Sequence, residues 1–190
     1  MALFGPAVQT TLENEGGFFH NQQTGEVVNF GITVWFLRSC GILQGSGAAS
    51  LREIEFVRSM SRDYAIELYR RNFWAPCNFA ALDAQILADK AFDLAVNMGK
   101  YAAVMLLQQA LNDVTQGTYK VDGVLGPKTA HGCNTTNEAK LYQAYLARAE
   151  ARYRAIARNP TAARIPSPDC PTLHRPAPCL RTGPKSIADA

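Results

Sequence analysis

The chain has 190 residues, 47% of them hydrophobic, so it is long enough to bury a substantial core. Its formal net charge of +3 is too small to indicate nucleic acid binding, and it would give only mild attraction to an anionic polymer such as a cell wall. No run approaches the roughly 18 uncharged apolar residues of a membrane-spanning helix, so none is expected.

Residues 1–6 lack the basic region and the long apolar region of a signal peptide. We therefore expect synthesis in the cytoplasm, with another export route if the protein acts outside. The five cysteines include no Cys-x-x-Cys pair, which favours reduced, mostly buried thiols over a zinc site. A Cys170–Cys179 disulfide is conceivable in an oxidising compartment. No metal or other cofactor is indicated.

The spacing of apolar residues predicts a mainly α fold with a short hairpin or irregular segment over 16–33. Two capping-box patterns, at 50–53 and at 135–138, mark the starts of helices. Helices are expected over 5–14, 34–43, from residue 50 onward, over 60–72, 83–98 and 100–114, and from the second capping box to about residue 158.

From Pro160 onward the composition changes, with seven of the ten prolines and no Phe, Trp or Tyr. Such a segment buries too little apolar surface to offset its chain entropy, so we expect a loose tail over 166–190. Before it, we expect a first region over 1–99 and a helical subdomain over 100–165 packed on it.

Glu15 stands out at the end of the first predicted helix. Phe4, Val8, Leu12 and Glu15 follow one another at four-, four- and three-residue steps, which places them on one stripe of a helix. If that stripe faces the core, burial would raise the pKa of the Glu15 carboxyl and suit it to act as a general acid. Glu13 is rotated away from the stripe and should face water.

Several segments together resemble the glycoside hydrolase 108 family of muramidases. Glu15-Gly16-Gly17-Phe18 is similar to its Glu-Gly-Gly-Tyr motif, and Asn29-Phe30-Gly31-Ile32-Thr33 to its downstream Tyr-Gly-Ile-Thr motif. Three later segments, 69–74, 92–99 and 107–129, resemble its Tyr-Arg-x-x-Tyr-Trp segment, its Asp-x-Ala-Val-Asn-x-Gly helix and its peptidoglycan-binding segment. The resemblance covers about residues 5–160.

The resemblance implies a lysozyme-like fold and hydrolysis of the β-1,4 bond between N-acetylmuramic acid and N-acetylglucosamine, with Glu15 as the general acid. Glycosidases usually need a second carboxylate. The loop over 19–26 lacks the aspartate that family members often carry there, and Glu26 is its only acid. Glu26, or a water oriented by Thr24 or Thr33, is therefore the candidate to complete the reaction.

Substrate contacts are expected from polar and aromatic residues around these motifs, against the plainer alternatives of surface, bracing or core roles. Asp93 and Asn97, one turn apart on an apolar helix, either brace neighbouring backbone or face the cleft. The full set of candidate contacts is His20, Asn29, Phe30, Tyr69, Trp74, Asp93 and Asn97.

The expected partner is peptidoglycan. Without a signal peptide, an enzyme of this kind fits an endolysin released by a holin, or an effector delivered by a secretion machine into a rival's periplasm and matched by a cognate immunity protein. Two other functions stay open: a non-catalytic peptidoglycan-binding module, and a secretion-assisting protein with a lysozyme-like core.

Overall fold

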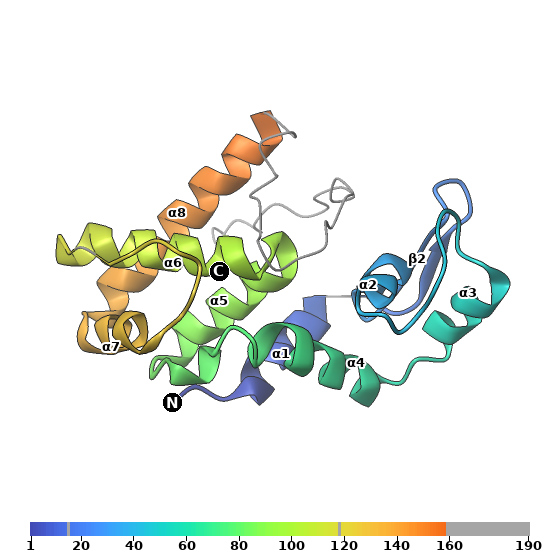
Figure 1. The fold of residues 1–190 in the computed structure, drawn as a ribbon, viewed down its shortest axis with the longest axis horizontal. Helices are drawn as coiled ribbons and strands as arrows, with labels where there is room; N and C mark the ends of the chain where they lie inside the picture. Colours follow the sequence, from blue (N-terminus) through green and yellow to red (C-terminus); the bar gives the residue numbers. More distant parts are fainter. Residues whose placement is uncertain (15, 118, 159–190) are drawn as a thin grey trace, which may run out of the picture.

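The computed structural model describes residues 1–14, 16–117 and 119–158, and it confirms a mainly α fold with a small sheet near the N-terminus. Figure 1 shows two parts, joined by α1 and α4. The smaller part contains β1 (Phe19–Asn21), β2 (Glu26–Asn29), β3 (Ile32–Thr33), α2 (Val34–Ser39) and α3 (Leu51–Arg58). The larger part contains α5 (Gln85–Met98), α6 (Lys100–Thr115), α7 (Pro127–Thr135) and α8 (Glu138–Arg158). Connecting elements are α1 (Phe4–Asn14), α4 (Arg62–Tyr69), a π-helical turn η1 (Arg70–Trp74) and a 3₁₀ turn η2 (Phe79–Ala81).

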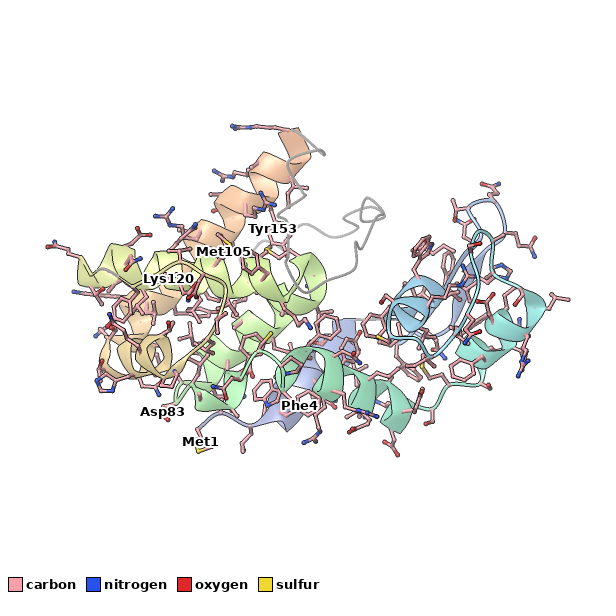
Figure 2. The ribbon with its side chains drawn as sticks, in the orientation of Figure 1. Met1, Phe4, Asp83, Met105, Lys120 and Tyr153 are labelled. Carbon is pink, nitrogen blue, oxygen red and sulfur yellow. The ribbon has the colours of Figure 1, made fainter. Side chains whose placement is uncertain are left out.

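Helix α5 lies at the centre of the core, in contact with α1, α6, α8 and η1. Its apolar face is fully buried at Leu87, Ala91 and Leu94. Phe92 contacts Phe4 of α1 and Trp74 of η1, with ring centroids 5.8 and 6.0 Å apart. These aromatic contacts fix α1 against the middle of the core (Figure 2).

The chain start is held against the N-terminal end of α5. The Met1 ammonium group lies 2.9 Å from an Asp83 carboxylate oxygen, and Figure 2 shows the two residues at the edge of the larger part. Leu3 and Gln85 exchange two hydrogen bonds, in which the Leu3 amide donates to the Gln85 side chain and that side chain donates back to the Leu3 carbonyl. The position of α1 is therefore fixed at its start as well as along its length.

Local sequence accounts for most helix starts. Ser50 and Glu53 form the predicted capping box, and Ser61 caps α4. Gly99 ends α5 at a φ of 94°, as its position after the apolar run predicted.

The second capping box was assigned to the wrong residues. The Thr135 and Thr136 hydroxyls donate to carbonyls of α7, so they belong to the end of that helix. Asn137 takes the capping role instead, since its side-chain oxygen accepts from the Lys140 amide. Helix α7 was missed altogether, although Pro127 occupies the first helical position, where its fixed φ is favourable.

Candidate functional site

Helix α1 has the predicted apolar stripe. Phe4, Val8 and Leu12 are all less than a tenth exposed, and Glu13 is exposed, as expected from its rotation. Glu15 lies outside the described residues, so its role remains a prediction. The helix ends at Asn14, directly before it, and Gly16 begins the segment that leads to the small sheet.

The hairpin that carries Glu26 is shaped by Asn21. Its side-chain oxygen accepts hydrogen bonds from the amides of Gln23 and Thr24, at 2.9 and 3.1 Å. Gly25, at a φ of 69°, supplies the left-handed residue that closes the turn. Glu26 follows immediately and is the first residue of β2.

The sheet register divides the candidate residues between two faces. Phe19 pairs with Val28, Val28 with Thr33, and Asn21 with Glu26. Because side chains alternate along a strand, these five residues share one face of the sheet. This outer face therefore carries two of the three candidates for the second catalytic role, Glu26 and Thr33, beside Phe19, which is 55% exposed.

Thr33 also caps α2. Its hydroxyl oxygen accepts a hydrogen bond from the Phe36 amide at 3.1 Å. A hydroxyl that accepts still has one hydrogen to donate, so Thr33 can cap the helix and orient a water at the same time. Thr24 is weakly engaged, with its hydroxyl 3.4 Å from the Glu26 amide.

His20 and Asn29 occupy the opposite, inner face with Val27 and Ile32. The Asn29 side chain is 4% exposed and donates to the carbonyls of Val57 and Arg58 at the end of α3. Its amide nitrogen therefore braces the sheet against α3. A substrate contact from Asn29 remains untested.

Phe30 and Gly31 form the two-residue turn between β2 and β3, with φ values of 51° and 75°. Two successive positive φ values are those of a type I′ turn, which suits a two-residue hairpin. The Tyr69 hydroxyl donates to the Phe30 carbonyl at 3.0 Å and ties this turn to α4.

Tyr69 and Trp74 are 1% and 6% exposed, within the aromatic core. A sugar ring needs an exposed aromatic face for stacking, and neither residue offers one in this conformation. Their expected role in substrate binding stays a prediction, whereas their packing role is plain.

Asp93 and Asn97 lie on the surface of α5. The Asn97 amide donates to the carboxylate and the backbone carbonyl of Asp93, and Lys90 lies 2.7 Å from the other carboxylate oxygen. The bracing role of Asp93 is therefore present, and a contact with the catalytic cleft stays a prediction. Asp93 braces its own helix, and it also lines a hollow of about 250 Å³ between α1, α5 and α8.

Sequence reasoning missed this hollow. It is lined by Ala7, Thr10, Thr11, Ile86, Asp89, Lys90, Asp93 and Tyr142. Its signal was a row of residues at helical spacing on α5, from Ile86 through Asp89 and Lys90 to Asp93, with charges on an otherwise apolar helix. Ile86 is 46% exposed beside it.

The turn after α6 is held by two side-chain amides. Gln108, fully buried, accepts from the amides of Asp122 and Gly123 and donates to the Asp122 carboxylate and the Val124 carbonyl. Asn112, one turn further along α6, exchanges two hydrogen bonds with the backbone of Tyr119. The turn is therefore rigid and presents Val124, 62% exposed, at its tip.

Comparison with known proteins assigns the two halves of the chain. Residues 8–99 match the model of the family described as glycosyl hydrolase 108. Residues 8–99 therefore form a glycosyl hydrolase 108 domain. Residues 102–166 match the family described as a predicted peptidoglycan domain. Together the matches support a role in peptidoglycan hydrolysis or binding.

The structure of Brucella abortus SagA is similar to this chain, with a TM-score of 0.58 and 23% identity over 84% of this chain and 87% of SagA. At that identity the likeness shows a shared fold. No curated protein is significantly similar in sequence.

None of the helices in the described ranges is long and apolar enough to cross a membrane. The described residues also contain no group of three or more His, Cys, Asp or Glu side chains placed to hold a metal ion. Of the cysteines that the structure describes, Cys77 and Cys133 are buried free thiols and Cys40 is partly buried. The tail over 166–190, with Cys170 and Cys179, lies outside the described residues.

Proposed function

We propose that this protein is an N-acetylmuramidase that cleaves the β-1,4 bond between N-acetylmuramic acid and N-acetylglucosamine in peptidoglycan. The observation that carries the proposal is the glycosyl hydrolase 108 match over residues 8–99, which includes Glu15-Gly16-Gly17-Phe18 directly after the buried helix α1. Glu15 donates its proton to the leaving glycosidic oxygen as positive charge develops on the sugar ring.

Glu26 or a water held by Thr33 completes the reaction. Both residues lie on the outer face of the sheet, and this placement supports a joint role. If Glu26 acts as a base, it deprotonates the attacking water; if it acts as a nucleophile, the product retains its configuration. His20, Asn29, Phe30, Tyr69, Trp74, Asp93 and Asn97 are the proposed contacts to substrate.

The decisive experiment compares the wild type with Glu15→Gln and with Glu13→Gln on purified peptidoglycan. Glu13 is the matched control, because it is an exposed glutamate two positions earlier whose partner is Gln9 on the same helix. Loss of a general acid should lower the rate by about 10²- to 10⁴-fold in Glu15→Gln, and Glu13→Gln should remain active. Released fragments with reducing N-acetylmuramic acid, identified by mass spectrometry, support the proposal.

Two other results would assign a different function. Products with 1,6-anhydro ends would make the protein a lytic transglycosylase. If neither the wild type nor the variant releases fragments but both still bind sacculi, the protein is a peptidoglycan-binding or secretion-assisting protein. The missing loop aspartate favours this alternative.

The setting we propose is action in the periplasm or at the cell wall, after holin-dependent release as an endolysin or delivery by a secretion system as an antibacterial effector. An effector would have a cognate immunity protein. Expression in the periplasm of a host, with and without the neighbouring gene product, tests this setting, because lysis that the neighbour suppresses identifies an effector.

A further inference from the structure

The hollow between α1, α5 and α8 continues along the surface into a second one. The first has a volume of about 250 Å³ and the second about 540 Å³, and both are lined by Ile86 and Tyr142. The second extends over the start of α8, at residues 137–139 and 143. The two hollows therefore form one groove along the outer side of α5, called here the α5 groove.

The α5 groove joins the two family segments. Its walls from α1 and α5 lie within residues 8–99, apart from Ala7, and its wall from α8 lies within residues 102–166. Thr10 and Thr11 bring it to the second half of α1, which ends at Asn14, one residue before Glu15.

Two groove carboxylates lack a cation among the described residues: Asp89 and the exposed Glu138 at the start of α8. Lys90 is paired with Asp93, as their 2.7 Å contact shows. Asp89 is partly buried and accepts a hydrogen bond from the neutral Gln85 side chain at 2.6 Å. Among the described residues Asp89 has no ion pair, and burial raises the pKa of its carboxyl, so an incoming cation would relieve an uncompensated charge.

The two threonines of the groove are engaged within their own helix. The hydroxyls of Thr10 and Thr11 donate to carbonyls within α1, at 3.3 and 3.2 Å. Ile86, with its 46% exposure, and the partly buried Tyr142 provide apolar surface beside Asp89. The groove therefore suits a ligand with an ammonium group on an aliphatic chain.

We propose that the α5 groove binds the peptide stem of peptidoglycan, with the free ammonium of the stem's diamino acid on Asp89 and its aliphatic chain against Ile86 and Tyr142. The proposal rests on the proposed function in one respect, that peptidoglycan is the substrate. The proposal adds that the protein recognises the peptide stem as well as the glycan, and that it prefers stems whose amine carries no cross-link.

The test uses sacculi whose free amines have been acetylated with acetic anhydride, beside untreated sacculi. Binding is measured by co-sedimentation in a Glu15→Gln background, which keeps the sacculi intact. We compare that parent with versions that also carry Asp89→Asn or Asp63→Asn. Asp63 is a matched control, because it is an exposed aspartate in the first turn of α4, outside the groove.

We expect the parent and the Asp63→Asn protein to bind untreated sacculi about tenfold more tightly than acetylated ones, as a charge-assisted hydrogen bond would give. Asp89→Asn should bind both equally. Nonspecific attraction predicts the opposite order, because acetylation makes sacculi more anionic and the protein is basic.

Equal binding by the parent to both kinds of sacculi would overturn the proposal, and so would a preference that survives Asp89→Asn. This outcome is separate from the hydrolysis assay. Glycan cleavage without amine dependence refutes the groove alone, and amine-dependent binding without cleavage by the wild type refutes the muramidase alone.

Discussion

The ion pair between Arg38 and Glu53 should govern the stability of the part that carries Glu26 and Thr33. Both side chains are 8% exposed, and the guanidinium donates to the two carboxylate oxygens at 2.7 and 2.8 Å. Arg38 also donates to the Gly47 carbonyl, and Glu53 accepts from the Ser50 amide. One pair therefore joins α2, the loop before α3 and the start of α3.

Replacement by Glu53→Gln removes the charge and keeps the shape. The Arg38 hydrogen bonds lower the pKa of the Glu53 carboxyl from 4.5 to about 2. At about 1.4 kcal/mol per pKa unit, this lowering by about 2.5 corresponds to about 3.5 kcal/mol at most. Solvent screening close to the surface reduces the expected loss of unfolding free energy to about 1–2 kcal/mol.

The sign of the pH dependence follows from the lowered pKa. Because the folded-state pKa lies below the unfolded one, the stabilisation is fully present above about pH 5 and is lost as the pH falls toward 2. Urea unfolding of wild type and Glu53→Gln should thus differ most at about pH 7, differ less at about pH 3 and converge only near pH 2.

The matched control is Glu55→Gln, whose partner Arg58 is 55% exposed and 3.3 Å away. Glu55→Gln should lower the free energy of unfolding by less than about 0.5 kcal/mol. A Glu53→Gln loss that is the same at both pH values, or a Glu55→Gln loss as large, would refute the electrostatic account.

Three further outcomes are expected. Asn29→Ala should lower the free energy of urea unfolding by about 1–2 kcal/mol, because it removes the 2.9 Å side-chain bond to the Val57 carbonyl and leaves that carbonyl only backbone donors such as the Met60 amide at 3.4 Å; a smaller loss would mean that water replaces the side chain. Gln108→Ala should lower the free energy of unfolding by about 2–3 kcal/mol, because it removes the hydrogen bonds that hold the 119–126 turn. If that turn contacts peptidoglycan, the variant should also co-sediment less with sacculi, whereas unchanged binding would give the turn a structural role only. Gly123→Ala should lower the melting temperature, because its φ is 70° and the added methyl would meet the Tyr101 ring, and Tyr101→Ala should restore part of the loss; no restoration would leave backbone strain as the whole cause.

Local chemistry explains what sequence reasoning predicted well. The stripe of Phe4, Val8 and Leu12, the Ser50 capping box and the Gly99 helix end each depend on residues a few positions apart. The same reasoning missed α7 and misplaced the second cap, because Thr135 and Thr136 bond back to Gly132 in a helix with little apolar periodicity.

The sequence by itself indicated the family of residues 8–99 and Glu15 as the candidate acid through short motifs in order, and the helical class through the spacing of apolar residues. Only the tertiary structure decided which candidate site residues lie on the same face and which are buried in the core. Strand register sets Glu26 and Thr33 on one sheet face and Asn29 on the other, and packing buries Tyr69. The α5 groove likewise exists only because α1 and α8, about 130 residues apart in the chain, pack on α5. Contacts over such separations leave no local pattern, so the sequence could not place Asp89 in a hollow.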